Sequence, residues 1–120
     1  MFELRICGHF AAAHRLREFG GKCEGLHGHN WKVEVEVAGA ETGPAGVVID
    51  FSRLKEELNL VLEELDHKDL SCHEHFSRVN PSSEELARYI FNRLKGRLSP
   101  AELRRVRVWE SEEACASYFE

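Results

Sequence analysis

Hydrophobic and polar residues alternate in the first segment of the chain, which is the pattern of a strand with one buried face. Glu3 and Arg5 fall on the polar face, and His14 is in phase with the apolar one. That apolar face is formed by Phe2, Leu4, Ile6, Phe10 and Ala12. A second alternation places on one face Trp31, Val33, Val35 and Val37. We therefore expect two strands joined by a long, glycine-rich loop over residues 15–28.

The middle of the chain carries two amphipathic helix patterns. The first begins at Asp50 or Ser52 as N-cap and is expected to end near Asp66. The second begins at Ser82, and Glu85 three positions later completes the pattern of a capping box. Apolar residues recur at helical spacing in both: Phe51, Leu54, Leu58, Val61, Leu62 and Leu65 in the first, and Leu86, Ile90 and Leu94 in the second.

Alternation returns near the carboxyl end and predicts two more strands, at residues 103–110 and 114–119. The expected order is β-β-α-α-β-β, and the strands are amphipathic. This order favours an α+β fold with one four-stranded antiparallel sheet and both helices on one face. The length of 120 residues favours a single domain over residues 1–120.

Composition narrows the class of protein. The net charge of −5 argues against a general binder of nucleic acid or of anionic membranes. No apolar run approaches the roughly 20 residues of a membrane span, and the charged N-terminal segment does not resemble a signal peptide. The four cysteines form no CxxC pair, so we expect reduced thiols in the cytoplasm, with Cys7 and Cys115 in structural roles within strands.

Three histidines occupy positions that suit a metal site. His27 and His29 are two positions apart, so both imidazoles point to the same side if the second strand begins early. If the first two strands pair antiparallel, His14 approaches both. Three imidazoles on one sheet face match a catalytic zinc site, which keeps a fourth position open. The alternative is that these are ordinary histidines held by hydrogen bonds.

A second His-x-His pair, His73 and His75, lies in a polar stretch without a predicted strand. Nothing in the pattern orders these two imidazoles relative to each other. We therefore treat the pair as a much weaker candidate for a metal site.

Other residues that could take part in a reaction lie in loops or at the ends of predicted elements. Cys23 follows Lys22 in the glycine-rich loop, where a cation and a nearby metal would favour the thiolate; the alternative is an incidental free thiol. Asp66 could orient His67 for acid/base chemistry. The alternative is that His67 only interacts favourably with the dipole at the C-terminus of the helix. Glu110 continues the inward phase of the third predicted strand, so it is either an anchor for a ligand with two N–H donors or a strand-end glutamate reaching solvent.

The sequence resembles the 6-pyruvoyl-tetrahydropterin synthase family, which includes bacterial 6-carboxy-tetrahydropterin synthases. The resemblance is carried by six segments in the family's order, and together they span nearly the whole chain. They are FAAAHRL (10–16), CEGLHGHN (23–30), GVVIDF (46–51), LDHKDL (65–70), NPSSE (80–84) and VRVWES (106–111).

This resemblance implies a tunnelling fold, in which three subunits close their sheets into a barrel and two trimers stack into a homohexamer. It implies zinc as cofactor and 7,8-dihydroneopterin triphosphate as substrate. The implied roles are zinc ligands for His14, His27 and His29, catalytic thiol for Cys23, acid/base pair for Asp66 and His67, and pterin anchor for Glu110. Arg15 and Lys22 are weaker candidates for phosphate contacts.

The expected product is 6-carboxy-5,6,7,8-tetrahydropterin, which feeds the queuosine pathway. Three residues separate Cys23 from His27, as in the carboxy-forming branch. Glu24 resembles the glutamate of a folate-making branch, so formation of 6-hydroxymethyl-7,8-dihydropterin is the alternative, beside 6-pyruvoyl-tetrahydropterin synthesis. Two alternatives belong to other classes of protein. A non-catalytic metal- or pterin-binding module would leave Cys23, Asp66 and His67 without a role. A three-histidine zinc hydrolase would leave Glu110 unexplained.

Overall fold

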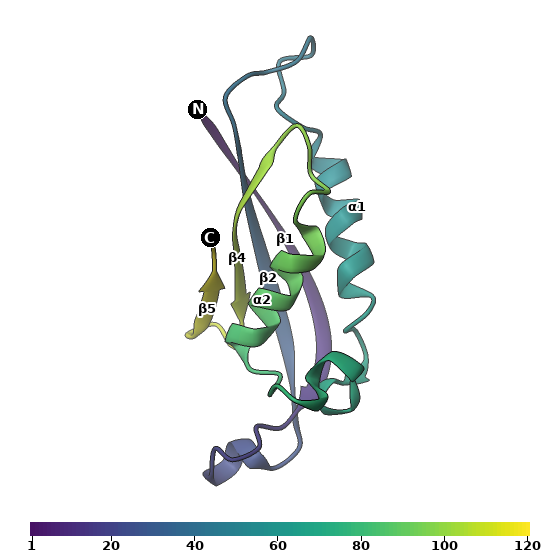
Figure 1. The fold of residues 1–120 in the computed structure, drawn as a ribbon, viewed down its shortest axis with the longest axis vertical. Helices are drawn as coiled ribbons and strands as arrows, with labels where there is room; N and C mark the ends of the chain where they lie inside the picture. The colour runs from purple at the N-terminus through teal and green to yellow at the C-terminus, as the bar shows by residue number, and fades with distance from the viewer.

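A computed structural model describes residues 1–120 and places a mixed sheet at the centre, with the strand order β3-β1-β2-β4-β5. The strands β1 (Phe2–His14) and β2 (His27–Gly39) pair antiparallel along their full length (Figure 1). Antiparallel pairing continues through β4 (Glu102–Trp109) and β5 (Cys115–Tyr118). These four strands confirm the four that the alternation predicts.

The fifth strand, β3 (Lys68–Asp69), corrects the expectation of a four-stranded, purely antiparallel sheet. It pairs with the end of β1 in parallel, opposite Ala12 and Ala13. His67 has a positive φ of 57°, and its backbone N–H donates to the carbonyl of Ala11 at 2.6 Å. This turn brings the chain alongside β1. Two residues are too few to produce an alternation, so the pattern could not reveal this strand.

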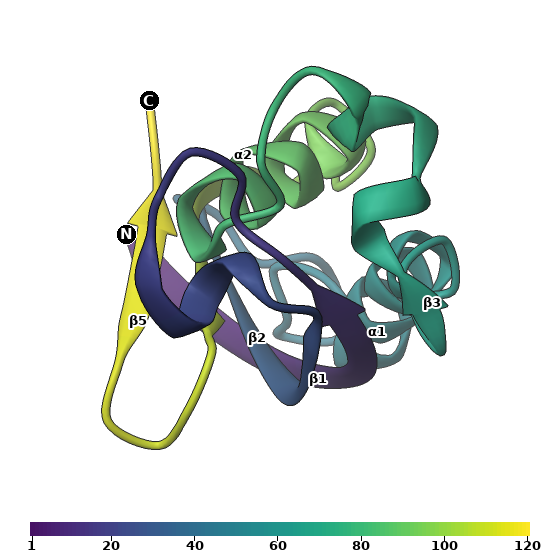
Figure 2. The same cartoon turned by 90° about the horizontal axis from the view of Figure 1, so that it is seen from below.

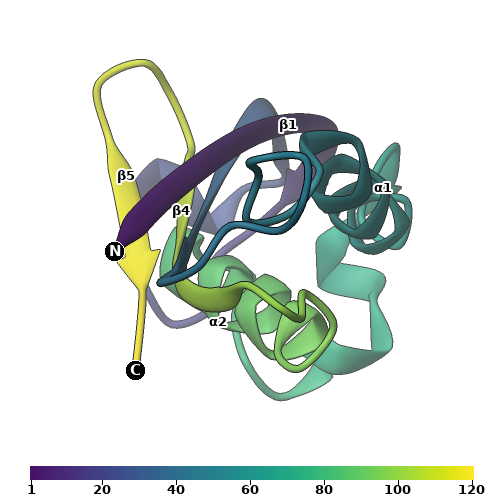
Figure 3. The same cartoon turned by 90° about the horizontal axis from the view of Figure 1, so that it is seen from above.

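The helices α1 (Phe51–Leu62) and α2 (Ser83–Leu94) cover the same face of the sheet (Figures 1 and 3). Asp50 caps α1 by accepting a hydrogen bond from the backbone N–H of Ser52. Ser82 caps α2 through the N–H of Glu85, as predicted. The helix α1 ends earlier than expected, and turns carry the chain on to β3.

The hydrophobic core lies between this sheet face and the two helices. The predicted helix stripes lie in this core except for Phe51, which is exposed, and α2 adds Ala87, Tyr89 and Phe91. On the strands the core residues follow the inward phase, but Phe2 is exposed. The central ones are Leu54, Leu58, Val61, Leu62, Leu86, Ile90 and Leu94 from the helices and Trp31, Val33, Val35, Val37, Val106 and Val108 from the sheet. Burial of these residues holds the strand ends, and hence the side chains beyond them, in one arrangement.

The other sheet face carries paired charges. The carboxylate of Glu34 is 2.9 Å from Arg107, and it accepts a hydrogen bond from the indole of Trp109 at 3.0 Å. Burial opposes ionisation of Glu34, but these two hydrogen bonds outweigh it and lower the pKa of the carboxyl. Cys7 and Cys115 lie in strands as predicted, but both are exposed, so neither is a core residue.

The connections contain short 3-10 helices where loops were expected. One, η1 (Gly21–Glu24), lies in the loop between β1 and β2, which extends past the end of the sheet (Figures 1 and 2). Two more, η2 (Leu70–Cys72) and η3 (Glu74–Ser77), lie between β3 and α2. Neither α1 nor α2 has the length and apolarity that crossing a membrane would require.

Candidate metal centre and active site

The register of β1 and β2 brings three histidines together at one end of the sheet. His14, the last residue of β1, is paired with His27, the first residue of β2, and His29 lies two residues further along. One ring nitrogen from each of the three lies within 4.8 Å of the others. The cluster predicted from strand phase is therefore present, and its geometry is that of a group that could hold a metal ion.

Backbone carbonyls orient two of these rings. His14 Nδ1 is 2.7 Å from the carbonyl oxygen of Pro81, and His27 Nδ1 is 2.7 Å from that of Gly25. Because a carbonyl only accepts, Nδ1 of each ring carries the proton, which leaves a lone pair on Nε2. A hydrogen bond from the ring nitrogen that does not bind the metal is the usual way in which proteins fix the tautomer of a metal-binding histidine.

The donor atoms of the cluster fit a metal ion. His14 is completely buried, and its Nε2 has no hydrogen-bond partner, like the Nε2 of His29. An unpaired buried nitrogen costs free energy unless a ligand satisfies it. Burial lowers the pKa of both His14 and His29, and it outweighs the opposite effects of the Pro81 hydrogen bond on His14 and of Glu110 on His29. The rings are therefore neutral at pH 7, which is the state that coordinates metals.

Glu110 lies against this cluster. Its Oε1 is 3.5 Å from His29 Nε2, and its Oε2 accepts a hydrogen bond from the hydroxyl of Ser83 at 3.4 Å. The side chain is 36% exposed, so it is half-buried at the rim and not enclosed in the core. Its carboxylate has room for a further partner, which is compatible with the predicted role in holding a ligand.

The loop between β1 and β2, which connects His14 to His27, carries Cys23. Cys23 lies in η1 and is partly buried, and its carbonyl accepts a hydrogen bond from the N–H of Leu16 at 2.7 Å. The carboxylate of Glu24 turns back into the same loop, where it accepts from the N–H of Glu18 at 3.0 Å. The two predicted phosphate contacts, Arg15 and Lys22, are exposed on this loop.

Asp66 and His67 are in direct contact with each other. The Asp66 carboxylate accepts from the backbone N–H of Ala11 at 2.9 Å and contacts His67 Nδ1 at 2.9 Å. The Ala11 hydrogen bond, followed by the His67 one, lowers the pKa of the Asp66 carboxyl. The imidazole of His67 is 82% exposed. It shares with His29 and Gly28 a shallow depression of about 490 Å³ along the edge of the sheet.

The second His-x-His does not form a comparable cluster. His73 and His75 both pack against the ring of Tyr89, with ring centres 5.6 Å and 4.8 Å apart. The Tyr89 hydroxyl donates to Glu64, and burial together with this carboxylate raises the pKa of Tyr89 to about 12. In this position the two imidazoles cover a packed aromatic side chain and face no third metal ligand.

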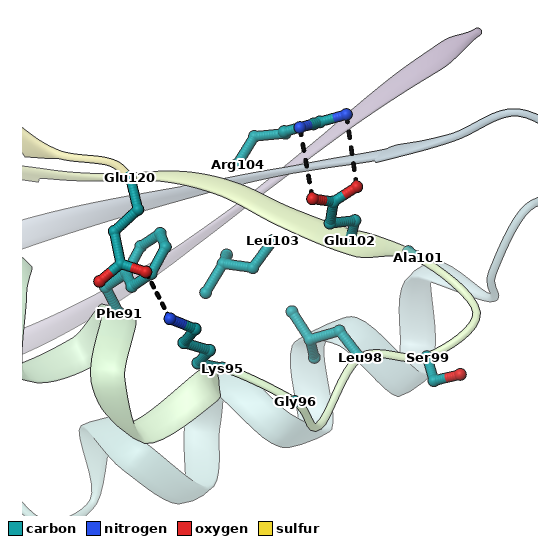
Figure 4. A pocket seen from close by; sticks show the side chains of 10 residues that line it. All are labelled: Phe91, Lys95, Gly96, Leu98, Ser99, Ala101, Glu102, Leu103, Arg104 and Glu120. Carbon is teal, nitrogen blue, oxygen red and sulfur yellow. Dashed lines mark hydrogen bonds and ion pairs between the residues drawn. The ribbon is translucent and has the colours of Figure 1, made fainter.

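A pocket of about 420 Å³ lies at the opposite end of the sheet, between the end of α2 and the start of β4 (Figure 4). Two ion pairs, Lys95 with Glu120 and Arg104 with Glu102, are among the residues that line it (Figure 4). It contains no histidine or thiol, so the chemistry of the chain is concentrated at the histidine end.

Sequence reasoning missed two residues that support the site, Arg17 and Asn80. Asn80 bonds to the backbone and the side chain of Arg17, in the loop that leads to Cys23. A signal was present for Asn80, because it opens the NPSSE segment that contributes to the family resemblance. No pattern pointed to Arg17.

Fold and site together define a small α+β protein with a three-histidine, metal-type centre at one end of its sheet. The profile of the family described as 6-pyruvoyl tetrahydropterin synthase matches residues 3–120. The chain therefore belongs to the 6-pyruvoyl tetrahydropterin synthase family, and it is an enzyme of this family of lyases.

Individual relatives lie on several branches. The chain is 40% identical to a 6-carboxy-5,6,7,8-tetrahydropterin synthase of Synechocystis sp., over 92% of this chain and 87% of the relative. It is 35% identical to the dihydroneopterin monophosphate aldolase of Pyrococcus furiosus, over 87% and 85%. The structure of the Caenorhabditis elegans 6-pyruvoyl tetrahydropterin synthase superposes with a TM-score of 0.89 at 32% identity, covering 99% and 95% of the two chains.

Proposed function

We propose that the protein is a zinc-dependent lyase that converts 7,8-dihydroneopterin triphosphate to 6-carboxy-5,6,7,8-tetrahydropterin. The observation that carries the proposal is the cluster of His14, His27 and His29, in which the buried Nε2 atoms of His14 and His29 have no hydrogen-bond partner within the protein. The similarity to a 6-carboxy-tetrahydropterin synthase supports the choice of product. The four free thiols suit the reducing cytoplasm, where we place the enzyme.

Zinc is the metal that suits three neutral imidazoles with an open fourth position. When bound, it would supply Lewis acidity toward the hydroxyl groups of the substrate side chain. Removal of metal with a chelator should abolish consumption of the pterin triphosphate, and added zinc should restore it. Full activity of a metal-free preparation would exclude the proposed cofactor.

The protein's own side chains would move the protons. Cys23, as thiolate, would take a proton from a carbon of the substrate side chain. His67 would exchange a second proton with the side chain as triphosphate leaves, and Asp66 would hold its imidazole in position through the 2.9 Å contact at Nδ1. Arg15 and Lys22 are exposed on the same loop and would attract the triphosphate.

Glu110 would bind the pterin ring through two ring N–H groups. We expect Glu110→Gln to weaken pterin binding by roughly 1.5–3 kcal/mol, because an amide offers one acceptor where the carboxylate offers two and a charge. Bound zinc should remain, since Glu110 is not among the three ligands. Isothermal titration with a pterin and metal analysis of the same preparation test both parts, and an unchanged pterin affinity would show that Glu110 is not the anchor.

A second product is favoured by one observation in the sequence and one relative. Glu24 adjoins Cys23, and the Pyrococcus furiosus relative is a dihydroneopterin monophosphate aldolase. If the Glu24 carboxylate leaves its hydrogen bond to Glu18 and acts as a base, cleavage between the two side-chain carbons nearest the ring would give 6-hydroxymethyl-7,8-dihydropterin. The pyruvoyl pterin remains a third product.

We also propose a homohexamer, built as two stacked trimers. The sheet ends in two open edges, β3 and β5, which closure into a barrel would pair. The polar, charge-paired face of the sheet would then line the inside of the barrel. Sedimentation equilibrium should give six times the mass of the chain, and a fully active monomer would contradict this assembly.

A further inference from the structure

The chain that leaves β1 is bonded through His14, Arg15 and Arg17 to the segment between β3 and α2. His14 donates from Nδ1 to the carbonyl of Pro81, at 2.7 Å. The next residue, Arg15, donates its backbone N–H to the hydroxyl of Ser71 at 3.0 Å. These bonds join two segments that are about sixty residues apart in sequence. The loop before α2 therefore supports the start of the loop that carries the thiol.

Asn80 makes the most extensive of these contacts. Its Oδ1 accepts from the backbone N–H of Arg17 at 3.0 Å and from Arg17 Nε at 3.0 Å. Its Nδ2 donates to the carbonyl of Arg17 at 2.7 Å. The Asn80 amide thus satisfies both backbone groups of Arg17, as a neighbouring strand would do in a sheet.

The guanidinium of Arg17 completes the connection. Its Nη1 donates to the carbonyl of Ser77 at 2.9 Å, and its Nη2 donates to that of Phe76 at 3.0 Å. Each of the three guanidinium nitrogens therefore has an acceptor within the protein. A guanidinium engaged in this way holds two loops together, in contrast to the exposed Arg15, which is free to meet an anion.

We propose that Arg17 and Asn80 form a clamp that positions Cys23 beside the histidine cluster. Leu16 lies directly before Arg17, and its N–H donates to the carbonyl of Cys23 at 2.7 Å, so the clamp is one residue removed from the thiol-bearing backbone. Both are positioning residues. The kinetic part of this inference rests on the proposed function, whereas the effect on the Cys23 thiol does not.

The clamp predicts a specific kinetic signature. In Arg17→Met and Asn80→Ala, kcat should fall by about 10- to 100-fold, because misplacing a reacting group by about 1 Å is enough for a loss of this size. KM should change little, since the polar groups of both side chains are already engaged in hydrogen bonds within the protein. A guanidinium that bound the triphosphate would give the opposite result, a raised KM with kcat retained.

The thiol itself supplies a readout that does not need turnover. In the zinc-loaded full chain, Cys23 is partly buried while Cys7 is exposed on a strand. Limited alkylation with iodoacetamide, followed by mass spectrometry of the labelled peptides, gives the rate at Cys23 relative to Cys7 in the same molecules. Loss of the clamp should raise this ratio several-fold.

Two milder variants and one control sharpen the test. Arg17→Lys keeps the charge but cannot reach three acceptors at once, so it should resemble Arg17→Met. Asn80→Asp keeps Oδ1 as an acceptor for Arg17 but sets a carboxylate oxygen in place of the donor to the Arg17 carbonyl, so it should fall between Asn80→Ala and the unaltered chain. Arg78→Met removes an exposed guanidinium from the same surface depression and should change neither readout.

The outcomes separate the clamp from the proposed function. A raised Cys23 ratio in the Arg17 and Asn80 variants, with Arg78→Met unchanged, supports the clamp even if the protein does not turn over the pterin triphosphate. An unchanged ratio in correctly folded Arg17→Lys and Asn80→Asp overturns it. If Arg17→Lys alone showed a normal Cys23-to-Cys7 alkylation ratio and a normal kcat, the clamp would also be overturned. The positive charge at position 17, and not the geometry of the guanidinium, would then be enough to position Cys23.

Discussion

Replacing Cys23 by alanine should reduce formation of 6-carboxy-tetrahydropterin by about 10²–10⁴-fold, the usual effect of losing a proton-transfer group. Zinc and substrate should still bind, because Cys23 is not among the three clustered histidines and the proposed pterin anchor is Glu110. Steady-state rates with the pterin triphosphate, together with metal analysis, measure both effects. Cys115→Ala is the matched control, since Cys115 is an exposed thiol on β5, and it should retain full activity.

In our proposal, the neighbouring Glu24 decides between the two products. We expect Cys23→Ala to spare some of the 6-hydroxymethyl product, and Glu24→Ala to remove that product while sparing the carboxy one. In the structure the Glu24 carboxylate bonds to the backbone of Glu18, so it must be released before it can act as a base. If Glu24→Ala changes neither product nor rate, Glu24 serves only to shape the loop.

Loss of His27 should remove the metal. We expect the unaltered protein to hold one zinc per chain, and His27→Ala to weaken zinc binding by more than about 100-fold, because losing even a hydrogen-bond partner of a ligand costs about 10–100-fold. His29→Ala should behave in the same way. Metal analysis after dialysis against a weak chelator gives the zinc content directly.

The second His-x-His pair provides the control for this experiment. His75 packs against Tyr89 and Phe76 and is not part of a metal-type cluster. His75→Ala should therefore retain a full complement of zinc. Zinc retained in both His27→Ala and His29→Ala would remove the three-histidine site from the account.

The histidine cluster could be predicted because it depends only on strand phase and pairing. His14 continues the inward phase of β1, and His27 and His29 begin that of β2, so antiparallel pairing brings them together. The helix caps at Asp50 and Ser82 could also be predicted, because capping depends on local residue types.

Other features depend on contacts between distant segments, which a local pattern does not encode. The strand β3 exists because the left-handed turn at His67 sets two residues beside β1. The bonds from Arg17 to Asn80 join loops that are 63 residues apart. The phase of Glu110 was read correctly, but its contacts with His29 and Ser83 depend on where α2 begins relative to β4.

The most direct test of the proposed function is to incubate the zinc-loaded protein with 7,8-dihydroneopterin triphosphate and to identify the pterin formed by liquid chromatography and mass spectrometry. We expect 6-carboxy-5,6,7,8-tetrahydropterin as the main product, formed with release of triphosphate and of a two-carbon fragment of the side chain. Formation of mainly 6-hydroxymethyl-7,8-dihydropterin would assign the protein to the alternative branch. Recovery of unchanged dihydroneopterin triphosphate from a folded, zinc-loaded preparation would contradict the proposed function.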